Sequence, residues 1–175
     1  MKLSKLFAKM NMVLEKIEEV ILCIGVGVLA IVLITNVIAR KSGTSIYFID
    51  ELAMLLVIWI TFIGLSYASR KGRHIRMAAL FDLSSLKVQK FMIYVISAIS
   101  AVIMFYMTHL SINYVYTTYR WQQMLPALRI PYWIGVVIVP LGFFLAGIHY
   151  IRTILQNIRM REEIWISPEQ KSEYE

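Results

Sequence analysis

Long apolar runs alternate with short polar segments along the whole chain. Four of these runs carry no Lys, Arg, Asp or Glu, and they cover Val20 to Ala39, Leu52 to Ser69, Phe91 to Tyr119, and Pro131 to Tyr150. About 20 apolar residues in a helix cross the roughly 30 Å hydrocarbon core of a bilayer. The pattern therefore predicts four transmembrane helices, at about 20–39, 46–69, 91–119 and 131–150.

Composition supports a membrane protein. Of the 175 residues, 59% are hydrophobic and 17% are charged, whereas a soluble domain carries about 25% charged residues. Four spans leave no room for a separate soluble domain, so we expect residues 1–175 to form a single all-α membrane domain. The first apolar run is too long for the core of a signal peptide and lacks a typical cleavage site, so we expect it to be retained as a helix.

The distribution of basic residues predicts the orientation. The net charge of +7 is compatible with nucleic-acid binding, but its placement favours a membrane. Fourteen of the 18 Lys and Arg residues precede the first span, lie between spans two and three, or follow the last, and four lie in the other loops (Arg40, Lys41, Arg120 and Arg129). Because cytoplasmic loops are rich in Lys and Arg, both termini are predicted to be cytoplasmic. Anionic phospholipids, and not nucleic acid, are the expected partners of the basic segments.

Segments outside the spans also show patterns. Residues 1–19 place Leu3, Phe7 and Leu14 at helical spacing, which predicts an amphipathic helix in the cytoplasmic headgroup layer; a cytoplasmic extension of the first span is the alternative. Apolar residues from Ile75 to Leu83 predict a second segment on the membrane surface or against a partner. Residues 160–175 read as a polar cytoplasmic tail.

Asp50 and Glu51 stand at the external entrance to the second span. Acidic residues at a helix N-terminus offset the helix dipole and cap free N–H groups, which is a purely structural role. An ion pair with Arg40 across the short loop, or a contact with a positive group on a partner, is the functional alternative. The sequence leaves both open.

Candidate chemistry is sparse. A proton relay needs carboxylates near the bilayer midplane, and the spans have none; His109 and His149 are better explained by hydrogen bonds between helices and by the helix dipole. Cys23 is the only cysteine, which excludes an intrachain disulfide. There is no nucleophile motif, phosphate-binding glycine loop or Cys/His metal spacing, so we expect neither an enzyme nor a cofactor.

Small residues four positions apart indicate close helix packing. Such pairs occur in the last three spans: Gly64 with Ala68, Ser97 with Ala101, and Gly142 with Ala146. They let helix backbones approach one another, within this chain or against another membrane protein. Pro140 is predicted to kink the fourth span.

One stretch is more specific than these patterns. From Ala39 the chain reads ARKSGTSIYFIDELAMLLVIWITFIGLSYASRKGRHIRM. It contains, in order, an arginine, an acidic pair and an apolar helix, followed by a basic turn (Arg40, Asp50, Glu51, Trp59, Gly64, Arg70, Gly72, His74). Later come Leu128-Arg129-Ile130-Pro131 and Val139-Pro140-Leu141-Gly142. This order resembles the small, four-helix membrane subunit of tripartite ATP-independent periplasmic (TRAP) transporters, over nearly the whole chain.

The resemblance implies a function. In this family a periplasmic binding protein captures a small organic acid, and a large multi-span subunit moves it inward by an elevator-like motion driven by a sodium gradient. The small subunit pairs with the large one in the bacterial inner membrane and braces its scaffold. The sequence departs from the family in two places. The family often has a tryptophan before a double glutamate, where this chain has Phe48-Ile49-Asp50-Glu51. It also often has an aspartate soon after the histidine that corresponds to His74, whereas the nearest aspartate here is Asp82.

Other functions remain open at this stage. A stand-alone channel or pump needs a polar pathway through the membrane, and the spans contain few residues that could line one. A membrane anchor or chaperone is a third possibility. The substrate is not encoded in this chain, and carboxylates, sugar acids and compatible solutes all stay open.

Overall fold

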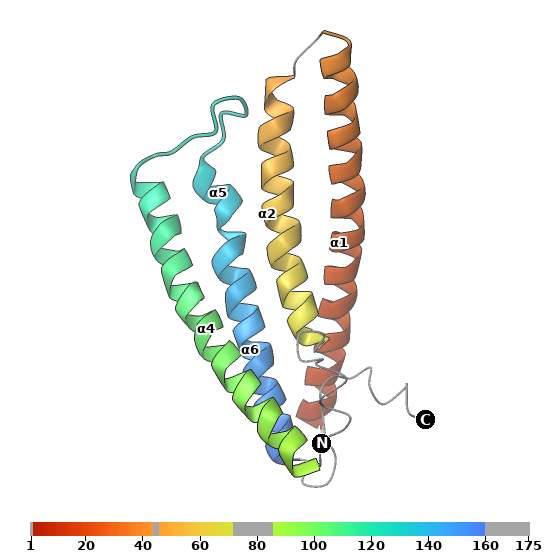
Figure 1. Cartoon of the computed structure of the whole chain (residues 1–175), viewed down its shortest axis with the longest axis vertical. Coiled ribbons are helices and arrows are strands. Elements are labelled where there is room, and N and C mark those ends of the chain that lie inside the picture. Colours follow the sequence, from red (N-terminus) through yellow and green to blue (C-terminus); the bar gives the residue numbers. More distant parts are fainter. Residues whose placement is uncertain (1, 44–45, 72–85, 160–175) are drawn as a thin grey trace. The chain divides into compact units, whose positions relative to one another are not determined.

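A computed structural model describes residues 2–43, 46–71 and 86–159. These described residues form five helices, and they include four segments that are long and apolar enough to cross a membrane, the fourth of which runs through the last two helices. The helices are α1 (Lys2–Lys41), α2 (Tyr47–Arg70), α4 (Leu86–Arg120), α5 (Tyr132–Val136) and α6 (Ile138–Arg159) (Figure 1). The described residues contain no strand, only an isolated bridge between Met124 and Pro131. The predicted all-α class with four membrane spans is confirmed.

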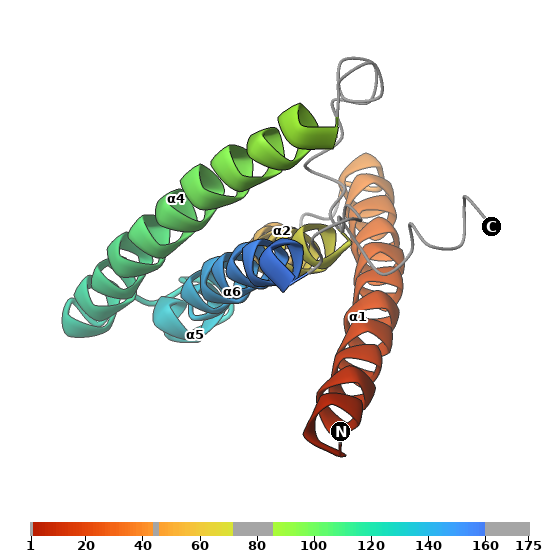
Figure 2. The same ribbon diagram turned by 90° about the horizontal axis from the view of Figure 1, so that it is seen from below.

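Helix α1 is continuous over 40 residues (Figure 2). The sequence predicted a separate amphipathic helix at 1–19, or an extension of the first span as its alternative, and the structure has the extension. Neither glycine nor proline occurs before Gly25, so nothing in the backbone chemistry interrupts the helix. The predicted surface segment from Ile75 to Leu83 and the predicted tail at 160–175 lie outside the described residues.

The fourth span is divided in two. Helix α5 ends at Val136 and α6 begins at Ile138. Pro140 has no backbone N–H to donate to the carbonyl of Val136, and its ring clashes with that carbonyl in a regular helix, so the interruption lies where the proline requires it. The helix also continues to Arg159, beyond the end predicted at Tyr150, because Ile151, Ile154 and Leu155 continue the apolar pattern.

The residues group into two compact units, called unit 1 (Met1–Gly64 and Asn113–Val139) and unit 2 (Leu65–Ile112 and Pro140–Glu175). In unit 1, α1 and the first part of α2 form an antiparallel pair (Figure 1). Glycines permit close approach in this pair: a Cβ at Gly25 would lie 3.1 Å from Ile60, and one at Gly64 would lie 3.7 Å from Leu22. Helix α5 packs beside α2 so closely that a side chain at Gly135 would collide with Leu55.

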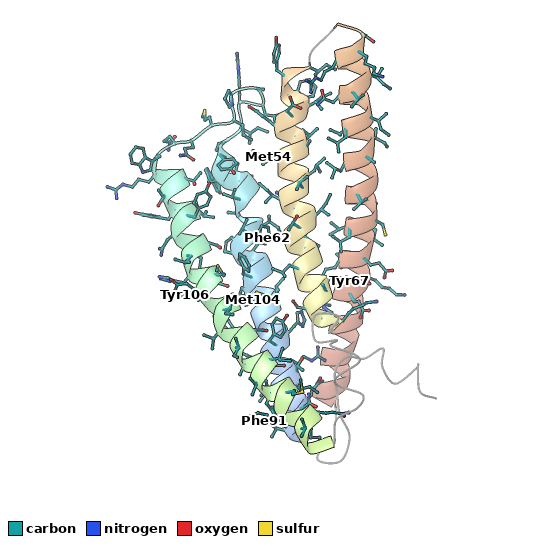
Figure 3. All side chains as sticks on the ribbon, in the orientation of Figure 1. Met54, Phe62, Tyr67, Phe91, Met104 and Tyr106 are labelled. Atoms are coloured by element: carbon teal, nitrogen blue, oxygen red, sulfur yellow. The ribbon has the colours of Figure 1, made fainter. Side chains whose placement is uncertain are left out.

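Unit 2 contains the most completely buried side chains. Ile93 and Ser97 on α4 and Ala146 on α6 are fully buried. The rings of Phe105 and Phe144 meet edge to face at 6.1 Å, and a Cβ at Gly147 would lie 3.2 Å from the Phe105 ring. Figure 3 places Met104 on the side of α4 toward α6 and Tyr106 on the opposite side, where it is 60% exposed. Small and aromatic residues therefore hold these two helices together.

Candidate functional site

The candidate site is the hairpin end of unit 1, defined here as residues 40–51 and 116–135. Its first part is the turn after α1. Gly43 has a φ of +76°, a left-handed conformation that suits glycine and ends a helix. The Ser42 amide donates to the carbonyl of Ile38, and the Gly43 amide donates to that of Arg40. This turn brings the start of α2 beside the end of α1.

Asp50 joins the two helices of this pair. It lies in the first turn of α2, and its Oδ1 accepts a hydrogen bond of 2.6 Å from the Asn36 amide on α1. Asn36 is only 8% exposed, so its amide needs a partner in an apolar surrounding. Asp50 therefore lies where an acidic side chain can offset the helix dipole. It also accepts the hydrogen bond of the buried Asn36 amide.

Glu51 connects α2 to a loop 76 residues further along the chain. Its Oε1 accepts a hydrogen bond from the Ala127 amide at 3.0 Å. Its Oε2 accepts from the same amide at 3.1 Å and from the Leu128 amide at 2.9 Å. Hydrogen bonds to a carboxylate are roughly twice as strong as neutral ones. The half-buried Glu51 is therefore the main polar connection between α2 and this loop.

The loop that Glu51 holds, Trp121 to Pro131, is tightly bonded within itself. The Leu125 amide donates to the Ile130 carbonyl at 3.0 Å, and the Arg129 amide donates to the Leu125 carbonyl at 2.8 Å. The Tyr132 amide closes the base by donating to the Gln123 carbonyl at 2.9 Å. Leu125 is buried (6% exposed) and anchors the loop. Hydrogen bonds therefore close the base of the loop and link its two sides.

Two residues in this loop have an unusual backbone conformation. Gln122 and Arg129 have φ values of 51° and 55°, a region that side chains other than glycine rarely adopt. Such conformations persist only where surrounding contacts impose them. At Arg129 two hydrogen bonds do so: the Arg129 amide donates to the Leu125 carbonyl, and the neighbouring Leu128 amide donates to Glu51. Pro131 follows as the N-cap of α5, with φ −60° and ψ 126°.

Trp59 makes a further long-range contact. Its indole Nε1 donates to the Gly135 carbonyl at 3.0 Å. Gly135 lies in the last turn of α5, beside the interruption at Val137. The indole therefore satisfies a carbonyl at a helix end, which would otherwise be costly in a membrane.

An ion pair between Arg40 and Glu51, one of the alternatives that the sequence left open, does not occur among the described residues. Glu51 binds backbone amides, and Arg40 is exposed at the end of α1. Glu51 instead binds two amides of a loop that no short-range pattern places beside it.

The remaining predicted site residues are dispersed. Gly64 and Ala68 lie on α2 and are half-buried, and Arg70, the last residue of that helix, is 7% exposed. Pro140 and Gly142 lie in the first turn and a half of α6, and Gly142 is buried. Gly72 and His74 lie outside the described residues. Among the predicted site residues, Asp50, Glu51 and Trp59 thus each bond a partner distant in the sequence, and they do so separately along α2.

Sequence reasoning missed Asn36 and the loop amides of Ala127 and Leu128. Asn36 is the only side-chain amide in the first apolar run and lies four residues before Arg40. An unpaired amide is energetically unfavourable in a membrane, and this could have indicated that Asn36 has a hydrogen-bond partner. The two amides carried no signal, because a backbone group looks the same at every position. Within the described residues no three His, Cys, Asp or Glu side chains could hold a metal ion.

Comparisons with known proteins identify the family. Residues 4–160 match the family model of the DctQ component of tripartite ATP-independent periplasmic transporters. The chain belongs to the DctQ family. The resemblance expected from the sequence is thereby confirmed.

Two relatives support this assignment. The chain is 37% identical over 161 residues to the ectoine TRAP transporter small permease protein TeaB of Halomonas elongata, covering 91% of this chain and 83% of the relative. It is 20% identical over 143 residues to the isethionate TRAP transporter permease protein DctMQ of Oleidesulfovibrio alaskensis, covering 77% of this chain and 22% of that longer protein.

Several conclusions follow from family membership. The chain is the small permease subunit of a TRAP transporter, and such subunits work with a large permease subunit. Its relatives are transporter components and not enzymes. It is a multi-pass protein of the bacterial inner membrane.

Proposed function

We propose that this small subunit braces the scaffold of the large permease subunit in a sodium-driven, binding-protein-dependent importer, with both of its termini in the cytoplasm. The single observation that carries the proposal is the apolar surface of α1. In the first span only 6% of the most apolar window is buried within the chain. A long apolar face next to a large membrane partner suits a scaffold contact.

The substrate class is proposed from the relatives. Their names indicate ectoine and isethionate, which are both small, highly polar organic molecules that carry an acidic group. We expect the importer to take up a small organic anion or zwitterion of this kind. Selectivity would lie in the binding protein and the large subunit, because the described spans of this chain hold no metal-binding cluster.

Reconstitution tests the proposed function. Liposomes that contain this chain alone should show no sodium-dependent uptake, and liposomes that contain it with the large subunit and a loaded binding protein should show uptake. Ectoine and isethionate are suitable first substrates. Uptake by the chain alone would overturn the proposal in favour of a stand-alone channel or pump.

Cysteine labelling tests the orientation. Cys23 is the only native thiol, so a Cys23→Ala background permits single cysteines at Ser42, Leu128 and Ser167. An impermeant maleimide added to intact spheroplasts should label positions 42 and 128 and should leave position 167 unlabelled. Labelling at position 167 would contradict the orientation derived from the basic residues.

A further inference from the structure

Basic side chains gather at one end of unit 2, where α2 ends beside α6. Arg70 is the last residue of α2 and is buried. Arg70 and the half-buried Arg152 on α6 are close enough to interact electrostatically with each other and with the buried His149. Lys71 follows Arg70 directly, and its Nζ lies 4.9 Å from the centre of the Tyr67 ring. The end of α2 and the adjacent part of α6 therefore carry a concentrated positive charge.

The described residues of unit 2 provide no acidic side chain to balance this charge. They cover 65–71, 86–112 and 140–159, and they contain six Lys and Arg residues but no Asp or Glu. Arg70 and Lys71 have further interactions within the chain, whereas Arg152 forms no hydrogen bond or ion pair with a described residue. A half-buried guanidinium without such a partner is energetically unfavourable. An anionic ligand at Arg152 would remove this cost.

The last turn of α2 also holds a buried hydroxyl without a partner. Ser69 is 5% exposed, and its Oγ forms no hydrogen bond with a described residue. Buried polar atoms are almost always hydrogen-bonded, and a Ser hydroxyl can donate to a phosphate oxygen. Ser69 immediately precedes Arg70 in the same helical turn. A hydroxyl donor together with guanidinium groups suits a phosphate, which arginine binds with two parallel hydrogen bonds.

An apolar strip on α6 begins at Arg152. Ile148 lies four residues before Arg152 and Leu155 three residues after it, which places all three on one face of the helix. Both apolar side chains are exposed, and the same face continues through the exposed Phe144 and Leu141. Because α6 runs from the outer to the inner side in the proposed orientation, Leu141, Phe144 and Ile148 lie deeper in the bilayer than Arg152. A basic group above an apolar strip matches the headgroup and acyl chains of a phospholipid.

We infer that Arg152, together with Arg70 and the Ser69 hydroxyl, binds the phosphate of an anionic phospholipid whose acyl chains lie along the apolar strip of α6. Arg70 and Arg152 lie one and two residues beyond the predicted ends of their spans, which is the depth of the headgroups. Basic pockets between transmembrane helices on the cytoplasmic side bind such headgroups. A zwitterionic lipid brings a positive charge of its own, so the basic cluster favours an anionic lipid.

The test measures lipid binding to the complex of this chain with its large subunit in an uncharged detergent. Native mass spectrometry gives the Kd of the first bound lipid for phosphatidylglycerol and for phosphatidylcholine, which has no net charge. We expect Arg152→Gln to raise the Kd for phosphatidylglycerol by about fivefold or more and to leave that for phosphatidylcholine unchanged. Arg152→Lys keeps the charge but loses the planar guanidinium, so it should raise the Kd less. Ser69→Ala should raise it by about twofold.

Matched controls separate a defined site from general attraction and from folding. Lys16→Gln also removes one positive charge, at an exposed position of α1, and should leave both Kd values unchanged. An equal rise for Lys16→Gln and Arg152→Gln would overturn the inference in favour of diffuse attraction. Phosphatidylglycerol should raise the Tm of the unmodified complex, and Arg152→Gln should lose most of this rise. If Arg152→Gln lowers the Tm equally with and without lipid, Arg152 has a structural role and the inference fails.

Three other outcomes would also overturn the inference. If inorganic phosphate raises the Tm as phosphatidylglycerol does, the cluster binds a free anion. If Arg152→Gln and Ser69→Ala both leave the Kd for phosphatidylglycerol unchanged, the cluster does not hold a lipid phosphate. If Arg152→Gln abolishes co-purification with the large subunit, the cluster faces that subunit. Failure of the proposed function has a separate signature, because a chain that does not co-purify with a large subunit can be titrated with the same lipids alone.

Discussion

The two units hold their helices together in different ways. In unit 1, three side chains reach across long stretches of sequence: Asn36 bonds Asp50, Glu51 bonds the loop at Ala127, and Trp59 bonds Gly135. In unit 2, the hydroxyls of Thr108, Ser111 and Thr153 bond carbonyls four residues earlier in their own helices. Its helices α4 and α6 meet at Gly147 and at the rings of Phe105 and Phe144.

The difference between the units follows from their content, because unit 1 includes a loop whose backbone has to be held in place. Polar side chains that bond their own helix satisfy their hydrogen bonds without fixing a neighbour, and close packing contributes to the cohesion of unit 2. Loops cannot be fixed by helix packing, because their backbone groups need individual partners. Unit 1 therefore uses a few directed hydrogen bonds, and removal of any one of them should have a local and measurable effect.

Removal of the Glu51 carboxylate should break unit 1 most severely. Glu51→Ala leaves the amides of Ala127 and Leu128 without their acceptor, and we expect a loss of about 2–3 kcal/mol in the free energy of unfolding. Glu51→Gln keeps one acceptor oxygen and should lose less. Titration with SDS in mixed micelles, followed by tryptophan fluorescence, measures both. Equal stability of Glu51→Ala and the unmodified protein would show that the loop does not depend on this residue.

The packing of unit 2 should be most sensitive at Gly147. Gly147→Ala places a methyl group 3.2 Å from the Phe105 ring, and overpacking costs about 1–3 kcal/mol. Gly27→Ala is the matched control, because nothing lies within 4 Å of its added Cβ. We expect Gly147→Ala to be less stable than Gly27→Ala in the same SDS titration. A double variant with Phe105→Leu should recover part of the loss if the ring causes it.

Loss of the Trp59 hydrogen bond should have a moderate effect. Trp59→Phe keeps most of the apolar surface and removes the donor to Gly135. Interhelical hydrogen bonds in membranes contribute about 0.6 kcal/mol on average, and we expect a loss of that order in the free energy of unfolding. Trp121→Phe is the control, since Trp121 is 74% exposed. A larger loss in the control would contradict the role given to the Trp59 indole.

Asp50→Asn should have the smallest effect. The new amide retains a carbonyl oxygen that accepts from Asn36, and Asp50 itself is exposed. We expect a change of about 0.5 kcal/mol or less and normal co-purification with the large subunit. Asn36→Leu distinguishes the two partners, because it removes the buried donor. If Asp50→Asn weakens assembly more than Glu51→Gln does, the order of importance derived from the hydrogen bonds is wrong.

Much of the fold was predictable from the sequence. The four apolar runs predicted the four spans, because a helix in lipid needs about 20 apolar residues and little else. The interruption near Pro140 followed from the missing N–H of proline. Helix ends were less accurate: Lys2 to Glu19 continues into the first span, and α6 continues to Arg159. Hydropathy marks where lipid ends, and a helix can continue into water.

The candidate site was predictable only in part. Asp50, Glu51 and Trp59 were identified as individual residues, and the structure shows that all three form side-chain hydrogen bonds. Their partners could not be predicted, because two of them are backbone groups 76 residues away in the sequence. The ion pair with Arg40, which the sequence left open as an alternative, does not form among the described residues, because Glu51 accepts hydrogen bonds from two backbone amides.

The continuous helix α1 has a practical consequence for imaging. Its 40 residues span about 60 Å at 1.5 Å per residue, which is about twice the hydrocarbon thickness. A rigid helical protein fused in register to its N-terminus would project from the detergent or lipid belt on a continuous rod. Such a fusion would give a small membrane subunit an orientation marker for particle alignment in electron microscopy.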